Sequence, residues 1–385
     1  MLIFDGRPPI PETETLNSLR EGVELEQHWR SGKIPFRVIE EALHLAQSRL
    51  AEALGLRGAE GVRLFSSGVE AANAAVKGFA WGAEGTRKGL AAVKGDPEGW
   101  MESCMHQERY GYKLKTLSLT PEGDLDAHSI DQIIDAQTAV AGLSSITPQV
   151  YAPRSWEDIS QACKNYQVPL AVDITNEIRL QNVSKYIGSC QAMVCDGLDL
   201  GSPMGGAVLW IKPGSRWSPL INGGDQQAGL RGGYFPLGPA LALTQTLSRN
   251  MLQREKRLEK FERLLWIYLD EMSHLLSDAI IPQVPERWPL GLSFILPGLE
   301  GEALVEMLKT GEVYISTGSA CVSAAGKPSP VLVGMGYAPE LVSGAVQVNF
   351  RDEHTEADVK ALVRRIVRAA NNLWRISGRK ISAWK

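Results

Sequence analysis

Apolar and polar positions follow two different periods along the chain. Between residues 36 and 55 apolar side chains recur every three or four positions, and the run ends at Gly55, which predicts an amphipathic helix. Short runs rich in apolar residues predict strands at 62–65, 89–94, 115–119, 139–143, 168–173, 192–195 and 206–211. Because strands and helical stretches alternate, we expect an α/β domain with a mostly parallel, doubly wound sheet.

The pattern changes beyond Tyr234. A long charged helical stretch from about 237 to 277 leads to strands near 292–296, 313–316 and 345–350, with helices near 302–308 and 355–374. A chain of 385 residues exceeds the usual size of a single core, so one large and one small domain are expected. We predict a large domain over 16–245, and a smaller α+β domain formed by 1–15 and 246–385.

Charge and cysteine usage exclude several classes of protein. A net charge of −4 with dispersed basic residues gives no field for nucleic acid, so we expect no nucleic-acid partner. No run of 18 apolar residues and no signal-like N-terminus occurs, which predicts no membrane contact. Five cysteines without a CxxC pair fit a reducing compartment, and we expect a cytoplasmic protein in which Cys190 and Cys195 are ordinary buried residues.

One cysteine stands apart from the others by its context. Cys321 ends the segment Ser-Thr-Gly-Ser-Ala-Cys at 316–321, directly after the apolar residues 313–315. Buried cysteines behave as small hydrophobes, whereas a thiol on a glycine- and serine-rich loop is free to act as nucleophile, sulfur carrier or metal ligand. The loop therefore indicates sulfur chemistry.

Polar residues also follow the predicted strands. Ser67 and Gly68 lie between the strand at 62–65 and a helix of small residues, while Asp173 ends the strand at 168–173 and Asn176 follows it. Ligands of open α/β sheets bind at the carboxyl ends of the strands. We expect these side chains to converge on one crevice.

Four segments, in order, resemble the cysteine desulfurases of the class V aminotransferase superfamily, which are fold-type I pyridoxal-phosphate enzymes. The segments are 65–78, 171–176, 224–233 and 316–321. The resemblance spans nearly the whole chain and implies a fold-type I aminotransferase-like structure. It also implies a homodimer, because family active sites are shared across a two-fold interface.

The resemblance assigns roles to several residues. Asp173 matches the carboxylate that pairs with the pyridinium nitrogen, and Asn176 stands where the family has a glutamine facing the ring oxygen. Ser67 and Gly68 match the phosphate-binding turn at a helix start, although the family's threonine is missing there. The glycine-rich segment that supplies a phosphate contact from the neighbouring subunit corresponds to the region of Gln226 and Arg231.

Other positions depart from the family pattern. Asp199 stands at the position of the Schiff-base lysine, and Pro97 replaces the histidine that stacks on the cofactor ring. Since an aspartate forms no imine, we expect no covalent Schiff base, and the loss of a positioned base alone costs roughly 10²–10⁴-fold in rate. Gln347 replaces the arginine that clamps a substrate carboxylate. Arg351 lies four residues further along the same strand, about 13 Å away, and is expected outside that pocket.

These observations favour a cysteine-desulfurase-like protein with a degenerate pyridoxal-phosphate site. In this hypothesis Cys321 accepts persulfide or ligates an iron–sulfur cluster on a docking scaffold, with a sulfur acceptor or iron–sulfur scaffold protein as partner. One alternative is an active enzyme that holds pyridoxal phosphate noncovalently through Asp173, Asn176 and the Gly68 turn, or that relies on a lysine-bearing paralogue as partner subunit. Another alternative is a non-catalytic protein that binds a small molecule.

Overall fold

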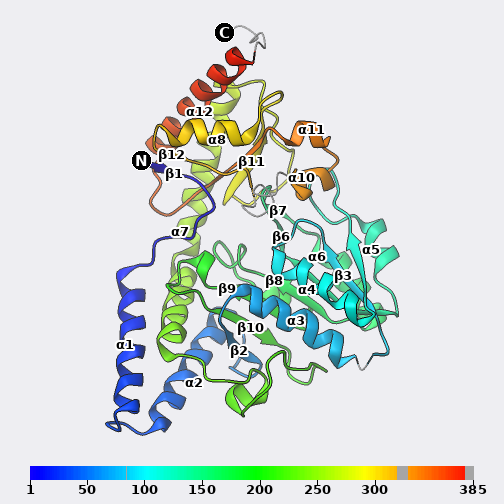
Figure 1. Cartoon of the computed structure of the whole chain (residues 1–385), viewed down its shortest axis with the longest axis vertical. Coiled ribbons are helices and arrows are strands. Elements are labelled where there is room, and N and C mark those ends of the chain that lie inside the picture. The colour runs from blue at the N-terminus through cyan, green and yellow to red at the C-terminus, as the bar shows by residue number, and fades with distance from the viewer. Residues whose placement is uncertain (84, 319–327, 378–385) are drawn as a thin grey trace.

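A computed structural model describes residues 1–83, 85–318 and 328–377 of the chain. Its centre is a seven-stranded sheet (Figure 1) in the order β2-β10-β9-β8-β5-β3-β4. β10 is antiparallel to both of its neighbours, and the remaining pairs are parallel. The strands are β2 (Val62–Phe65), β3 (Gly89–Val93), β4 (Lys113–Leu117), β5 (Thr138–Ser144), β8 (Leu170–Asp173), β9 (Ala192–Asp196) and β10 (Ala207–Ile211).

Helices cover both faces of this sheet. In β3, Leu90 and Ala92 belong to an apolar cluster with α3 and α4, whereas Ala91 and Val93 belong to a second cluster with α2, α5 and α6. Successive strand residues point to opposite faces, so a strand that is apolar throughout is covered on both sides. The helices are α2 (Phe36–Ala53), α3 (Gly68–Gly82), α4 (Glu98–Gln107), α5 (Ala127–Ile133) and α6 (Trp156–Tyr166).

A second apolar core lies in the C-terminal part of the chain. It contains Phe294 and Val348 from one two-stranded sheet, Val313 from another, and Ile366 from the last helix. The N-terminus joins this core, because the first strand pairs in parallel with β12. The elements are β1 (Leu2–Ile3), β11 (Gly291–Ile295), α8 (Gly301–Lys309), β12 (Val313–Tyr314), α10 (Pro330–Gly334), α11 (Pro339–Val342), β13 (Ala345–Asn349) and α12 (Glu356–Ile376).

The helix α7 (Leu237–Leu275) runs through both cores without interruption (Figure 1). Its Leu243 and Leu247 pack in the core of the large sheet, while Phe261 and Tyr268 pack in the second core. The predicted fold class, a mostly parallel α/β sheet with a smaller α+β part, is confirmed. The division at 245/246 falls inside α7 and stays a prediction.

Two local differences from the sequence prediction have physical reasons. β4 begins two residues earlier than expected; it is the edge strand, and Lys113 is exposed there, so its apolar pattern is weak. The helix α1 (Thr13–Arg30) was not predicted, because Thr15 and Gly22 are its only buried positions among the described residues. Gly22 lets α1 approach α7 closely, since a Cβ atom there would lie 2.5 Å from the Cα atom of Gly238.

Smaller elements complete the described chain. β6 (Ile146–Thr147) and β7 (Ala152–Pro153) form a short antiparallel pair after β5. Within the described ranges, no helix combines the length and apolar character needed to cross a membrane.

Candidate functional site

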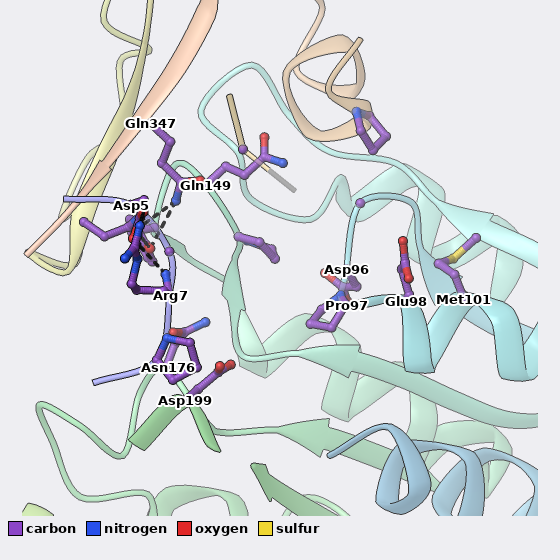
Figure 2. Close-up of a pocket in the computed structure, with 18 of the residues that line it drawn as sticks. Asp5, Arg7, Asp96, Pro97, Glu98, Met101, Gln149, Asn176, Asp199 and Gln347 are labelled. Carbon is purple, nitrogen blue, oxygen red and sulfur yellow. Dashed lines mark hydrogen bonds and ion pairs between the residues drawn. The ribbon is translucent and has the colours of Figure 1, made fainter. Parts of the chain in front are cut away.

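The carboxyl ends of the parallel strands border a cavity of about 730 Å³. Lys94 and Pro97 follow β3, Asn176 follows β8, and the small α+β part contributes Gln347 from β13 and the segment 5–9 after β1. In Figure 2, Asn176 and Asp199 lie below Arg7 and Asp5, and Pro97 faces them across the opening. A cavity at the strand ends is therefore present; of the residues expected there, Asn176 lines it, and Ser67 lines neither this cavity nor the recess described next.

A much smaller inner recess, of about 70 Å³, lies next to this cavity. Pro97, Asn176 and Asp199 line both spaces. The recess brings together four of the residues predicted from the sequence, namely Gly68, Asp173, Asn176 and Asp199. It also contains Asp196, which the sequence reasoning missed although it directly follows the predicted strand at 192–195 and obeys the same strand-end rule.

Two N–H groups at the start of α3 donate to side chains of the chain itself. The Ser67 hydroxyl accepts a hydrogen bond from the Glu70 N–H at 3.2 Å, as a helix cap. The Gly68 N–H donates to Oδ2 of Asp196 at 3.0 Å. A helix N-terminus is a natural anion site because its N–H groups point outward, and here the anion is a carboxylate of the same chain.

Arg231 reaches the same end of α3 within one chain. Its guanidinium pairs with the Glu70 carboxylate at 3.1 Å, and both side chains are largely buried. Glu70 also accepts hydrogen bonds from the Ser66 N–H and hydroxyl. Together with the contact to Arg231, these bonds outweigh the effect of burial and lower the pKa of Glu70. Arg231 does not line either cavity, so a phosphate contact across a dimer interface stays a prediction.

Gln226 is exposed and also lies away from both cavities. The next residue makes the specific contacts of this segment: Gln227 accepts from the Leu64 N–H at 2.6 Å and donates to the Leu64 carbonyl at 2.9 Å. These bonds satisfy the free edge of β2. Within this chain the segment therefore closes a sheet edge, and the cofactor role of Gln226 stays a prediction.

Asp173 sits at the bottom of the recess and is held by two donors. Its Oδ2 accepts a hydrogen bond from the indole Nε1 of Trp100 at 3.1 Å, and its Oδ1 accepts from the Thr175 N–H at 2.9 Å. Burial nevertheless raises its pKa, and the charge of Asp196 adds to the shift. The carboxylate is thus fixed at the strand end where the sequence places it.

Asp199 lies in a single helical turn, Leu198–Leu200, and its carboxylate is exposed into the cavity (Figure 2). Surrounding protein raises its pKa to about 6, and the neighbouring charges of Asp196 and Asp173 add to the effect. Among the residues that the structure describes, Asp199 has no hydrogen-bond or ion-pair partner for its side chain. Arg179, in the turn after β8, is near enough to lower this pKa but forms no ion pair with it.

The part of the cavity wall formed by Gln347, Tyr151 and Asn349 is polar and uncharged. Nε2 of Gln347 donates to the Tyr151 hydroxyl at 3.2 Å and to Oδ1 of Asn349 at 3.1 Å, while the Tyr151 hydroxyl donates to the same Oδ1. Nδ2 of Asn349 is buried without a hydrogen-bond partner among the described residues. Burial raises the pKa of Tyr151 to about 12, so it remains a neutral phenol.

The expectation that Arg351 lies outside this pocket is wrong. β13 ends at Asn349, so the strand spacing does not extend to Arg351, which lines the same cavity as Gln347. Its guanidinium is engaged by the protein itself: Nη2 donates to the carbonyls of Arg7 and Pro8 at 2.8 and 2.6 Å, and Nη1 pairs with Glu353 at 3.0 Å. Arg351 therefore holds the 5–9 segment in place.

Lys94 is the only lysine among the described residues that line the two spaces, and it borders the large cavity. The described lining of the recess contains three aspartates and no lysine, arginine or histidine. Sequence reasoning missed both Lys94 and Arg179, because an isolated basic residue after a strand carries no signal of its own.

The four cysteines within the described ranges are all buried. Burial raises the pKa of Cys104, Cys163 and Cys190 to about 12, and that of Cys195 well above its usual value, so none is a thiolate at neutral pH. The expectation that Cys190 and Cys195 are buried is confirmed. Cys321 lies outside the described residues, while Gly318 and Pro328, on either side of its segment, line the large cavity.

Comparison with known proteins supports this architecture. The aminotransferase class-V family model matches residues 36–362. A cysteine desulfurase IscS of Rickettsia peacockii (strain Rustic) is 26% identical over 345 residues, which cover 87% of this chain and 83% of that protein. The cysteine desulfurase IscS of Dictyoglomus turgidum (strain DSM 6724 / Z-1310) is 24% identical over 351 residues, covering 89% and 87%.

Solved structures agree on the fold. A NifS-like protein superposes with a TM-score of 0.84 at 18% identity, over 97% of this chain and 100% of that one. The NifS-like protein from Rickettsia africae ESF-5 gives a TM-score of 0.82 at 15% identity, over 96% and 99%. The chain therefore belongs to the aminotransferase class-V family, as a relative of its cysteine desulfurases.

Proposed function

We propose that this protein is a cysteine desulfurase homologue whose pyridoxal-phosphate site is degenerate, and that Cys321 accepts sulfur or ligates iron on a docking scaffold. The family implies pyridoxal phosphate as cofactor; by the resemblance, the start of α3 would hold its phosphate and Asp173 would pair with its pyridinium nitrogen. The observation that carries the proposal is the charge of the recess. Its described lining holds three carboxylates and no cationic side chain.

The residues of the recess do not fit a phosphorylated ring. A phosphate needs free N–H groups, yet the Gly68 N–H donates to Asp196, and Arg231 is paired with Glu70. The carboxylates of Asp196 and Asp199 would repel a phosphate dianion placed beside them. The recess of about 70 Å³ is far smaller than the roughly 300–1,000 Å³ of small-molecule pockets, so a phosphorylated ring would have to extend into the adjoining cavity past Asp199.

Sulfur transfer to Cys321 does not require this cofactor. The Cys321 thiolate attacks the terminal sulfur of a donor persulfide, the donor S–S bond breaks, and a new S–S bond forms on Cys321. The electron pair of the broken bond leaves with the donor as its thiolate, so no external oxidant is needed. Selectivity is supported by the burial of the four described cysteines, whose thiols stay protonated.

A direct test exposes the protein to glutathione persulfide and counts added sulfur atoms by intact-protein mass spectrometry and peptide mapping. We expect one added sulfur atom on Cys321, none in Cys321→Ser, and no change of pattern in Cys104→Ser. Labelling of a buried cysteine in place of Cys321 would contradict the sulfur-acceptor proposal. Under anaerobic coexpression with iron–sulfur assembly proteins, a cluster lost in Cys321→Ser would favour the iron-ligand form of the proposal.

The alternatives make different predictions for the same preparation. An active enzyme, with noncovalent pyridoxal phosphate or with a lysine-bearing partner subunit, would release sulfide from free cysteine. We expect no release, and we expect Lys94→Ala to leave that result unchanged. A homodimer and a sulfur-acceptor partner are part of the proposal and can be tested by size-exclusion chromatography with light scattering.

A further inference from the structure

The large cavity contains charged side chains that have no partner among the described residues, and two of them, Arg179 and Asp199, carry opposite charges. Among the described residues, the guanidinium of Arg179 makes no hydrogen bond and no ion pair, although it lines the cavity. Asp199 is equally unpartnered on the same floor, and it is ionised above a pH of about 6. Arg179 is half-buried, and charges inside a protein are normally paired or hydrogen-bonded, so its guanidinium calls for an external partner.

Several other charged groups of the cavity are used internally. Arg7 is paired in a two-pronged contact with Asp5, with distances of 2.9 and 2.6 Å to its Oδ2 (Figure 2). Arg351 is held by backbone carbonyls and Glu353, and Asp96 forms a buried ion pair with Arg154 at 2.6 Å. Lys94, which follows β3, and Glu98 and Glu102, on α4, also line the cavity without a described partner, but all three are exposed. Arg179 differs from them because it is half-buried, and Asp199 lies close enough to affect its pKa.

Side-chain amides make up much of the remaining polar wall. Gln149, Asn176, Gln347 and Asn349 all line the cavity. Nδ2 of Asn349 is buried without a described partner, and the amide of Asn176 makes no side-chain hydrogen bond in the part of the chain that the structure describes. A side-chain amide can donate a hydrogen bond to a peptide carbonyl and accept one from a peptide N–H. This lining therefore suits a ligand that contains peptide bonds.

We propose that this cavity binds a short zwitterionic peptide of two or three residues, noncovalently, with its carboxylate on Arg179 and its ammonium on Asp199. The volume of about 730 Å³ suits a ligand larger than a single small amino acid. An arginine is well suited to a carboxylate because its planar guanidinium can donate two parallel hydrogen bonds. A polyanion is disfavoured, because Asp199 would repel a second negative charge beside Arg179.

This site uses neither Cys321 nor a cofactor, so it extends beyond the proposed sulfur-acceptor function. Binding and sulfur transfer can fail independently. Cys321→Ser removes the sulfur-accepting thiol and leaves Arg179 and Asp199 unchanged, so peptide binding can be tested without sulfur transfer.

The test is isothermal titration calorimetry of the full chain, at a pH well above 6, with L-alanyl-L-alanine and trialanine as probes. Two blocked probes remove one charge each: N-acetyl-alanyl-alanine lacks the ammonium, and alanyl-alanine amide lacks the carboxylate. We expect both blocked dipeptides to bind at least ten-fold more weakly than alanyl-alanine. Free L-alanine is expected to bind more weakly than the dipeptide.

Variants locate the two ends of the probe. Arg179→Gln and Asp199→Asn are each expected to lower the affinity for alanyl-alanine at least ten-fold, and Asp199→Asn is expected to abolish the advantage over the N-acetyl probe. Arg375→Gln and Asp131→Asn are matched controls in exposed positions away from the cavity, and they should bind like the wild type. Cys321→Ser should also bind like the wild type.

Three results would overturn the proposal. Equal binding of the acetylated and free dipeptides would show that the ammonium does not contribute to binding. Equal binding of alanyl-alanine amide and alanyl-alanine would show the same for the carboxylate. Tighter binding of L-alanine than of either peptide would contradict the peptide class. The blocked probes are measured on the wild-type protein, so the outcome does not depend on whether a variant folds.

Discussion

The inner recess and the large cavity share Pro97, Asn176 and Asp199, yet most acidic groups around the recess have partners within the chain, whereas several charges of the cavity have no described partner. Around the recess, acidic groups complete the fold: Asp196 accepts from Gly68, Asp173 accepts from Trp100, and Glu70 pairs with Arg231 nearby. In the cavity, Arg179 and Asp199 have no described partner. A satisfied buried charge is part of the structure, whereas an unsatisfied one in an open cavity indicates where a ligand belongs.

The largest expected effect concerns a charge that is fully partnered beside the cavity. The side chains of Asp96 and Arg154 are 0% and 1% exposed, and Asp96 also accepts from the Ser144 N–H. Asp96→Ala leaves a buried guanidinium without its partner, so the free energy of unfolding should fall by about 3–5 kcal/mol. Urea unfolding measures this loss.

The matched control for that experiment is Glu41→Ala. Glu41 pairs with Arg37 on an exposed helix face, and we expect a change within about 0.5 kcal/mol. A loss below about 1 kcal/mol for Asp96→Ala would mean that the buried pair of Asp96 and Arg154 contributes little to stability, contrary to the contrast drawn between paired and unpaired charges.

The second effect concerns the anion position at α3. Asp196→Ser removes the carboxylate from the Gly68 N–H and lowers the negative charge of the recess, so inorganic phosphate should bind at least ten-fold more tightly than to the wild type, about 1.4 kcal/mol. Calorimetric titration with phosphate measures the change, and Asp131→Ser is the control for loss of an aspartate elsewhere. Equal phosphate binding by wild type and Asp196→Ser would show that Asp196 does not compete for the helix end.

A third effect is a pH dependence caused by Asp199. Its pKa is raised from 3.8 to about 6, so the folded state binds more protons than the unfolded state between these values. The contribution of Asp199 to stability therefore falls as pH rises from about 4 to 6. Asp199→Asn removes this penalty. Because solvent reaches the side chain, we expect a gain of about 1 kcal/mol at neutral pH and none below pH 4.

Thermal unfolding of wild type and Asp199→Asn across this pH range measures the difference between the two proteins. A gain that is the same at acidic and neutral pH would mean that Asp199 is not the titrating group.

The smallest effect separates capping from ligand binding at Ser67. The hydroxyl caps α3, so Ser67→Ala should lower the free energy of unfolding by about 0.5–1 kcal/mol. The loss should be the same with and without added phosphate. A loss that grows in phosphate would instead assign Ser67 to an anion site.

Much of this fold could be predicted from the sequence, because buried parallel strands are apolar throughout. The strand 168–173 ends at Asp173 as β8 does, and Gly68, Asp173, Asn176 and Asp199 meet in one recess as the strand-end rule requires. The long-range partners could not be predicted. Nothing local in the sequence states that Asp196 reaches the N–H of Gly68, 128 residues away, or that Arg351 reaches the segment after the first strand.

The measurement that tests the central claim most directly is a titration of the purified protein with pyridoxal phosphate, followed by near-visible absorbance and by retention after gel filtration. We predict no aldimine band and no retained cofactor in the wild type. The double variant Asp196→Ser/Asp199→Lys, which restores a lysine and removes two carboxylates from the recess, should retain more cofactor. Stoichiometric retention with an aldimine band in the wild type would contradict the account.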